Sequence, residues 1–316
     1  MKIFFAGTPE IAVKSLEAVA GRYEVCGVLT NPDRPAGRKG LLKQSPVKEK
    51  ALSLGLTVYQ PEKPDSGFID SVRALSPDIL VTFAYGRIFK KDFLSLFGRE
   101  ALNIHPSLLP LYRGPSPLNA VILSGVNKTG ITIQRMALKM DSGDILAQIT
   151  LPLRGDETLE SLSETVSVKS AEMILKLLAD IESGNYTSSP QDESSATYCR
   201  LVEKNDGLID WSESAVMIER KSRAYHPWPG IFTYWKGKLI TITKCHVSNA
   251  LGPVPSDILP GTVAGIDRKD GILIKTGEGF LAVTELKPQS KNNMDFKSFL
   301  NGARDFSGSK LTGFQE

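Results

Sequence analysis

Asn103 and His105 stand two residues apart at the end of an apolar run and are followed by Pro106. Side chains two positions apart in a β-strand point to the same face of the sheet. Open α/β sheets bind their ligands at the carboxyl ends of their strands. An amide donor and an imidazole placed there can both act on a carbonyl oxygen that becomes negative during a reaction. The pair therefore predicts attack on a carbonyl group.

A carboxylate near the imidazole would complete such a site. Asp141 and Asp144 lie in one turn, Met-Asp-Ser-Gly-Asp. Either carboxylate can orient a histidine, favour its protonated form or help to pass a proton through water. A single histidine at a strand end more often binds only a backbone carbonyl. Here the Pro-Ser-Leu-Leu-Pro segment that follows His105 and the acidic glycine turn favour a catalytic role. The residues alone leave both aspartates open.

Strand-like and helix-like segments alternate before this site and must position it. The expected strands cover residues 2–6, 24–30, 56–59, 78–84 and 101–105. The expected helices cover residues 11–19, 47–54, 68–75 and 93–97, with Thr8 as a possible N-cap of the first. Such alternation is typical of βαβ units. It predicts a Rossmann-like α/β domain with a mostly parallel sheet and helices on both faces.

The second half of the chain changes in character. Strand-like segments at 129–138 and 145–153 flank the acidic turn, and a long amphipathic helix is expected at 159–181. A polar, turn-rich stretch and a helix at 214–225 come next. Five short β-like segments follow, at 231–235, 238–245, 261–266, 271–276 and 279–286, and glycine or proline separates most of them. This pattern predicts a small OB-like β-barrel. The expected domains are 1–188 (catalytic), 189–205 (linker) and 206–316 (OB-like).

Composition limits the class of protein. The chain has 316 residues, 41% hydrophobic and 23% charged, a net charge of +3 and three cysteines. No apolar run approaches the roughly 18 residues that span a bilayer, and the apolar N-terminal stretch is too short for a signal-peptide core. We therefore expect a cytoplasmic protein, without disulfides. Gly7-Thr8-Pro9 lacks the further glycines of a dinucleotide-binding loop.

Basic residues gather in one segment that is rich in glycine and proline. Between Asp33 and Lys50, six cationic side chains face two acidic ones. The cations are Arg34, Arg38, Lys39, Lys43, Lys48 and Lys50. A flexible basic loop of this kind can contact RNA phosphates and base edges. A solvated charged loop would have the same composition, so the neighbouring site is what favours the RNA interpretation.

Residues 103–117, Asn-Ile-His-Pro-Ser-Leu-Leu-Pro-Leu-Tyr-Arg-Gly-Pro-Ser-Pro, resemble the signature of the 10-formyltetrahydrofolate-dependent formyltransferases. The resemblance implies that Asn103, His105 and Asp141 are the catalytic residues, because the family's aspartate opens an Asp-x-Gly turn and Asp144 does not. It also implies a folate site. The residues implied for that site are Ser107, Leu108, Leu109, Pro110, Phe83, Tyr85 and Gly86.

Further motifs are similar to those of the family members that act on methionyl-tRNA. They lie at residues 5–10, 32–38, 45–48, 196–198, 209–211 and 227–229. The resemblance implies that the acceptor is the free α-amine of methionyl-initiator tRNA and that Arg38 enters its acceptor end. The expected tRNA contacts are Arg34, Arg38, Lys39 and Lys43. The OB-like domain is expected to bind tRNA as well, and the active form is expected to be a monomer.

The implied reaction is direct attack of the amine on the formyl carbon, through a tetrahedral intermediate. His105, protonated as that intermediate forms, and the Asn103 amide would stabilise the negative oxygen. Asp141 would hold His105 and assist the proton on its way to the leaving nitrogen. No metal is required, since the imidazolium and the amide supply the electrophilic help.

Two other functions remain open from the sequence. The same chemistry could serve another acceptor, such as a nucleotide-sugar amine or glycinamide ribotide, or water in a formyltetrahydrofolate hydrolase. A glycinamide-type enzyme would leave residues 206–316 unexplained, whereas a sugar formyltransferase can carry a similar second domain. The chain could also be a non-catalytic RNA-binding protein on an enzyme scaffold, against which the intact Asn103, His105 and Asp141 argue.

Overall fold

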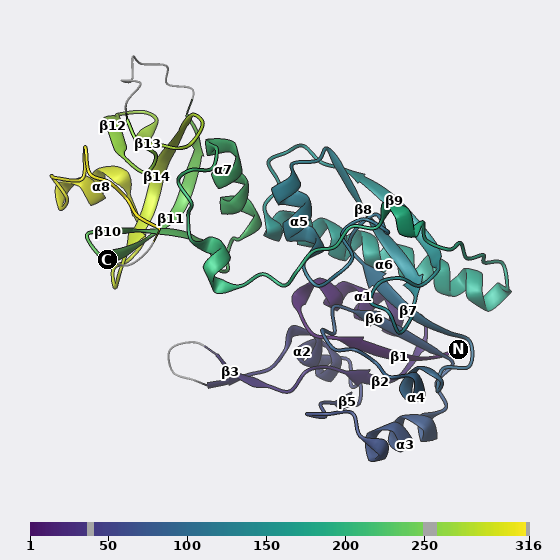
Figure 1. Ribbon diagram of the computed structural model, residues 1–316. Helices are drawn as coiled ribbons and strands as arrows, with labels where there is room; N and C mark the ends of the chain where they lie inside the picture. The colour runs from purple at the N-terminus through teal and green to yellow at the C-terminus, as the bar shows by residue number, and fades with distance from the viewer. Residues whose placement is uncertain (37–40, 249–257, 314–316) are drawn as a thin grey trace. The chain divides into compact units, whose positions relative to one another are not determined.

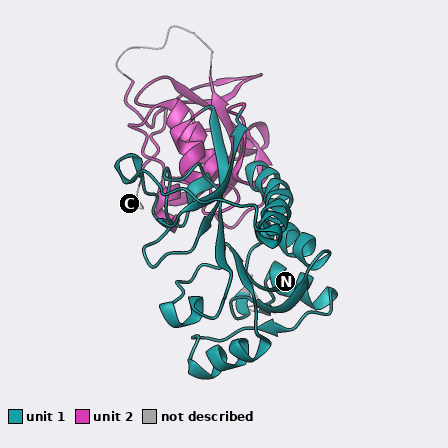
Figure 2. Cartoon of the chain, turned by 90° about the vertical axis from the view of Figure 1, so that its right-hand side faces the viewer, with its two compact units in different colours: residues 1–118, 127–153, 161–200 teal, residues 119–126, 154–160, 201–316 magenta. Residues whose placement is uncertain are grey.

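The computed structural model describes residues 1–36, 41–248 and 258–313 (Figure 1). The chain forms two compact units, coloured separately in Figure 2. Unit 1 consists of Met1–Leu118, Asn127–Leu153 and Ser161–Arg200. Unit 2 consists of Asn119–Val126, Arg154–Glu160 and Leu201–Glu316. Each unit is described below by itself. No helix in the described ranges is both long enough and apolar enough to cross a membrane.

Unit 1 is built on a sheet whose seven described strands have the order β5-β2-β1-β6-β7-β8-β9. The strands are β1 (Lys2–Gly7), β2 (Glu24–Leu29), β5 (Val58–Tyr59), β6 (Ile79–Phe83), β7 (Glu100–His105), β8 (Lys128–Arg135) and β9 (Ile145–Pro152). Pairings from β5 to β7 are parallel, and β8 and β9 are antiparallel. The predicted α/β fold with a mostly parallel sheet is therefore confirmed.

The helices of the α/β region lie close to their predicted positions. They are α1 (Val13–Ala20), α2 (Pro46–Ser53), α3 (Ser66–Leu75), α4 (Lys91–Leu94) and α6 (Leu159–Ser183). The predicted N-cap at Thr8 is wrong, because Pro9 is extended and a 3₁₀ turn (η1, Glu10–Ala12) precedes α1. The Thr8 hydroxyl instead contacts the carbonyl oxygen of Tyr85 and the amide of Asn31. Helix α5 (Pro117–Ser124) was not predicted.

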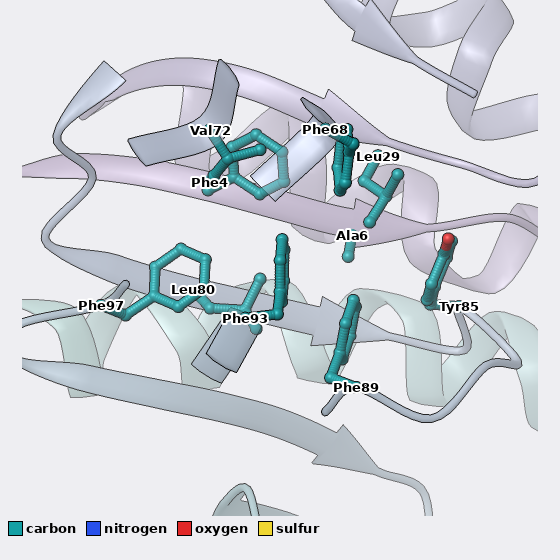
Figure 3. Packing of buried hydrophobic residues seen from close by; sticks show 10 residues of the cluster. All are labelled: Phe4, Ala6, Leu29, Phe68, Val72, Leu80, Tyr85, Phe89, Phe93 and Phe97. Carbon is teal, nitrogen blue, oxygen red and sulfur yellow. The ribbon is translucent and has the colours of Figure 1, made fainter. Parts of the chain in front are cut away.

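An aromatic cluster packs on one face of the sheet (Figure 3). Phe93 of α4 stacks on Phe89 and on Phe68 of α3, with ring centroids 4.7 and 5.8 Å apart. Phe4 of β1 meets Phe93 edge to face. Stacked and edge-to-face pairs add about 0.5–1.5 kcal/mol each to the stabilisation from burial. Phe5 of β1, which points to the opposite face, is also fully buried. Both faces of the sheet are therefore covered.

Unit 2 contains an antiparallel sheet with the path β10-β11-β14-β13-β12, and β15 pairs with β14. The strands are β10 (Ile231–Trp235), β11 (Lys238–Val247), β12 (Val263–Asp267), β13 (Gly271–Lys275), β14 (Phe280–Pro288) and β15 (Met294–Asp295). Its helices are α7 (Ala215–Ala224), α8 (Phe296–Asn301) and most of α5, and a 3₁₀ turn lies at Lys204–Gly207. A further 3₁₀ turn, Glu193–Ser195, belongs to unit 1. A separate antiparallel β unit is thus confirmed. Among the described residues no ladder joins β10 to β12, so the pairings show no closed barrel.

The chain end contributes to this sheet. Thr312 exchanges two backbone hydrogen bonds with Tyr234 of β10, and Ser309 accepts one from Val263 of β12. Leu311 between them is buried. Residues 308–312 therefore contact both edge strands of the sheet, a role that no sequence motif indicated.

Candidate active site

Strand β7 places Asn103 and His105 at the carboxyl edge of the sheet. Gly7 of β1 is in register with Phe83 of β6, and Phe83 with Ile104 of β7, so the ends of the three strands lie side by side. On its other side β7 pairs with the antiparallel strand β8, where His105 lies opposite Thr132. The predicted pair therefore lies where open α/β sheets bind their ligands.

The structure brings Asp141 to the same place. Its Oδ1 accepts hydrogen bonds from Asn103 Nδ2 (3.3 Å) and Gln134 Nε2 (2.9 Å). Its Oδ2 accepts one from the backbone N–H of Gly114 at 2.9 Å and lies 3.6 Å from His105 Nδ1. Asp141 has a left-handed backbone, with φ of 51°. All three residues that the sequence resemblance implied for catalysis thus meet, around one carboxylate.

His105 lies in a strongly polar but closed environment. Its side chain is 5% exposed, and Nε2 is 3.0 Å from the carbonyl oxygen of Tyr112. Burial lowers the pKa of His105, while the Asp141 charge and the Tyr112 carbonyl act in the opposite direction. A carbonyl oxygen only accepts, so Nε2 carries the hydrogen and Nδ1 of the neutral ring holds a lone pair. Burial thus favours the neutral form of the ring, in which Nδ1 is the basic atom.

Asp144 is occupied elsewhere. Its carboxylate accepts hydrogen bonds from Arg135 (3.0 Å) and from Ser188. Arg135 also binds the buried carboxylate of Glu100 through two hydrogen bonds. These contacts hold the end of β8 and the acidic turn, and none of them involves His105. The geometry thus distinguishes the two aspartates, because only Asp141 lies near His105. The residue types alone left both of them open.

The Ser107–Pro110 segment is held from β8 and β9. The Thr132 hydroxyl donates to the Ser107 carbonyl oxygen at 2.7 Å and accepts from the Leu109 N–H. The Gln148 amide donates to Thr132 and to the Leu109 carbonyl oxygen. Ser107 and Leu109 are buried, whereas Leu108 and Pro110 are half-buried. The segment is therefore fixed by hydrogen bonds, and Leu108 and Pro110 are its accessible residues.

The loop after β6, also expected at the folate site, offers mainly its backbone. The side chains of Phe83 and Tyr85 are buried, and Tyr85 stacks on Phe89 at 5.2 Å between centroids (Figure 3). Ala84 and Gly86 are exposed and have φ of 51° and 82°. The left-handed turns present the peptide groups of this loop at the sheet edge, next to the end of β7.

The basic segment forms a two-stranded hairpin of β3 (Arg34–Ala36) and β4 (Leu41–Lys43), and we call these two strands the basic hairpin. Arg34 and Lys43 face each other in its register. Both line a cavity of about 420 Å³, together with Thr8, Pro9, Asn31, Pro32, Ser45, Pro46 and Arg87. Arg38 and Lys39, which were expected to contact tRNA, lie outside the described residues.

Several residues of this site were not singled out from the sequence. Gln134 lies beside Asn103 in the β7–β8 register, so strand alternation would have placed it. Arg113 and Gly114 belong to the signature at 103–117, but their roles were not predicted. Gln191 donates to the backbone carbonyl oxygens of Asp141 and Gly143. No local pattern distinguishes it in the polar stretch where it occurs.

Two family models match the chain. One, described as formyl transferase, matches residues 1–178. The other, described as formyl transferase, C-terminal domain, matches residues 201–304. The methionyl-tRNA formyltransferase of Treponema denticola is 43% identical over 315 residues, which are 97% of this chain and 98% of that protein. That of Roseiflexus castenholzii is 41% identical over 316 residues, with 99% of each chain covered.

Solved structures share the fold. An N-formyltransferase from Helicobacter canadensis, in complex with folinic acid and dTDP-3-aminofucose, has a TM-score of 0.66 at 20% identity, covering 90% of this chain and 99% of that one. HypX from Aquifex aeolicus, in complex with tetrahydrofolic acid, has a TM-score of 0.63 at 18% identity. That match covers 97% of this chain and 48% of HypX, so this chain spans about half of its length. At these identities the likeness shows the fold alone.

Proposed function

The chain belongs to the formyl transferase family, and from this premise we propose that it transfers the formyl group of 10-formyltetrahydrofolate to the free α-amine of methionyl-initiator tRNA. The acceptor rests on one observation: relatives that carry methionyl-tRNA in their names are 41–43% identical over nearly the whole chain. The chemistry rests on the meeting of Asn103, His105 and Asp141 around one carboxylate.

Features of the sheet edge fit a folate donor. Leu108 and Pro110 offer apolar surface, and the backbone at Ala84 and Gly86 offers peptide groups to a flat, polar ring system. The hydroxyl of Tyr85 is buried and has no hydrogen-bond partner among the described residues. We propose that the segment with Leu108 and Pro110 and the loop of residues 84–86 hold the donor. Its formyl group supplies the carbon that the amine attacks.

His105 manages the proton in this proposal. The attacking amine must lose a proton, and the nitrogen that leaves the formyl group must gain one. Nδ1 of the neutral imidazole is the free base, and it faces the Asp141 carboxylate at 3.6 Å. A proton taken up at Nδ1 is stabilised there by the opposite charge. His105 therefore becomes protonated as the carbonyl oxygen becomes negative, and returns the proton afterwards.

Asn103 stabilises the negative oxygen. Its amide nitrogen has two hydrogens, and one of them points to Asp141 Oδ1 at 3.3 Å. This contact orients the amide, so the second hydrogen is available to the oxygen that becomes negative. Loss of a single donor of this kind lowers kcat by about 10²–10³ in other acyl-transfer sites.

The acceptor tRNA is recognised by charge in this proposal. Arg34 and Lys43 of the basic hairpin, with Arg38 and Lys39 between its strands, contact the phosphates of the acceptor end. Arg34 is exposed and pairs with the exposed Glu62, a contact that a phosphate can replace at little cost. We further propose that residues 206–316 form an OB-like, tRNA-binding domain, and that the active form is a monomer.

One assay tests the function. Purified protein is incubated with 10-formyltetrahydrofolate in three separate reactions. Each reaction contains one acceptor: initiator methionyl-tRNA, elongator methionyl-tRNA or a dTDP-amino sugar. We expect formylation of the initiator tRNA at least about tenfold faster than of either other acceptor. Formylation of the sugar but not of the tRNA would overturn the acceptor, and no formylation of any amine would overturn the chemistry.

A further inference from the structure

The loop of residues 112–114 contacts both ionisable groups of the active site. The carbonyl oxygen of Tyr112 accepts from His105 Nε2, and the N–H of Gly114 donates to Asp141 Oδ2. Tyr112 has φ of 58° and Gly114 has φ of 115°. A left-handed backbone costs a residue other than glycine of the order of 1 kcal/mol, so the surroundings must hold this conformation. The residue between these two contacts is Arg113.

Arg113 is the anchor of this loop. Its side chain is fully buried. The guanidinium donates to Gln191 Oε1 (2.8 and 3.1 Å), to both carboxylate oxygens of Glu193 (2.6 and 3.1 Å) and to the hydroxyl of Tyr198 (3.1 Å). Its backbone N–H donates to the Thr197 carbonyl oxygen, and its carbonyl oxygen accepts from Cys199. Residues 191–199 thus hold Arg113 by side chain and backbone together.

Gln191 connects this anchor to the acidic turn. Its Oε1 accepts from Arg113, while its Nε2 donates to the carbonyl oxygens of Asp141 (2.9 Å) and Gly143 (2.7 Å). The turn has no spare room, since a Cβ at Gly143 would lie 1.8 Å from the Arg135 carbonyl oxygen. One side chain therefore spans the two segments that hold His105 and Asp141 in place.

We propose that Gln191 and Arg113 are positioning residues, which set the separation of His105 and Asp141. The catalytic role of His105 rests on the proposed function, but its placement does not. The segment that follows α6 is then part of the active site's support as well as the connection to the next unit. Neither residue has to touch a substrate for this role.

The experiment compares two variants of Gln191. Gln191→Met removes the links to Arg113 and to the acidic turn, together with a hydrogen bond to Gln134. Gln191→Glu keeps an acceptor for Arg113 but loses the donor to Asp141, Gly143 and Gln134. We expect kcat to fall about tenfold or more in both, with KM for tRNA and for the folate within about twofold of the wild type. In Gln191→Met we also expect a lower His105 pKa, because Asp141 opposes the effect of burial less well when it is displaced.

The pKa is measured by NMR from the ring C–H signal of His105. The chain has three histidines, so His105→Gln assigns the signal. Tyr186→Phe is the matched control, because it removes one hydrogen bond to Glu100, which is linked to the acidic turn through Arg135 and Asp144. A lower melting temperature with unchanged kcat and unchanged His105 pKa would overturn the proposal. The titration distinguishes this failure from that of the proposed function, since it needs no substrate.

Discussion

Two regions of unit 1 use charge in opposite ways. The catalytic corner, by which we mean Asn103, His105 and Asp141 with segments 112–114 and 191–199, is centred on side chains that share hydrogen bonds. Of these, His105 and Arg113 are buried, and Asn103, Asp141 and Gln191 are half-buried. In the basic hairpin, Arg34 is 67% exposed and its partner Glu62 is 69% exposed. Lys43 makes no ion pair with any residue that the structure describes.

The difference follows from what each region must do. Stabilising charge in a reaction requires groups that are already in place, because reorganising them would add to the barrier. Contact with a polyanion requires cations that can exchange a weak partner or water for a phosphate. Exposed ion pairs contribute about 0–1 kcal/mol and are easily given up. Mutations in the two regions should therefore affect different kinetic constants.

The largest effect is expected from His105→Ala. We expect kcat to fall by about 10³, and Asp141→Asn to lower it by about 10²–10³, because the proton acceptor or its stabilising charge is lost. KM for tRNA should change less than about threefold in both variants. Steady-state kinetics with methionyl-initiator tRNA measure both constants.

Asp144→Asn is the matched control for Asp141→Asn. Asp144 carries the same charge three residues away but binds Arg135 and Ser188. We expect kcat within about threefold of the wild type. Equal losses of kcat in the two aspartate variants would contradict the assignment of Asp141, rather than Asp144, to catalysis. They would also remove the contrast between the two regions. Near-normal turnover in His105→Ala would refute the mechanism itself.

The sequence predicted the parts of this site that are local. Asn103, His105 and the acidic turn are visible because strand alternation and turn composition act over a few residues. The fold class was predictable for the same reason, from the alternation of segments. Helix α8 was missed although its N-cap, Asp295, is a typical start signal. Helix α5 was missed because it directly follows a stretch rich in glycine and proline.

What the sequence could not predict are contacts between distant segments. Arg113 and Gln191 are 78 residues apart along the chain. Nothing in the composition of residues 182–196 distinguishes the half-buried Gln191 from the exposed serines around it. The choice of Asp141 over Asp144 came from family resemblance, and the geometry supplies the physical reason: only one of the two carboxylates is near His105.

The next effect should fall on tRNA binding alone. In the double variant Arg34→Glu and Lys43→Glu, repulsion replaces attraction at two phosphate contacts. We expect KM for tRNA to rise about tenfold at physiological salt, with kcat at saturation and KM for the folate within about twofold. The slope of log(kcat/KM) against log salt concentration should also become shallower.

Lys14→Glu is the matched control for the hairpin variant. Lys14 is an exposed lysine of α1 that pairs with Glu164. Reversal of its charge should leave KM for tRNA within about twofold of the wild type. An equal rise in both variants would mean that only overall charge matters. A loss of kcat in the hairpin variant would break the division between the two regions.

A smaller effect concerns the titration of His105. Burial lowers its pKa, so we expect an NMR titration midpoint below the ordinary value of about 6.5. In Asp141→Asn the opposing charge is gone, and the midpoint should fall further. The proton-accepting form therefore predominates above the midpoint and is lost as pH falls through it. A midpoint above 6.5 in the wild type would contradict the neutral resting state.

The smallest effect is expected at Glu193, the exposed end of the catalytic corner. Its hydrogen bonds from Arg113 and Lys139 lower its pKa from 4.5 to about 2. A lowered carboxyl pKa stabilises the fold above pH 4.5, and this contribution is lost as pH falls from about 4.5 to about 2. The difference in free energy of unfolding between the wild type and Glu193→Gln should therefore shrink across this window, as measured by urea unfolding at pH 6, 4 and 3. Glu62→Gln, which breaks the exposed pair with Arg34, should cost less than about 1 kcal/mol at pH 6. If the difference in free energy of unfolding between the wild type and Glu193→Gln stays constant with pH, Glu193 behaves like the exposed pair of the basic hairpin. It would then not belong to the catalytic corner.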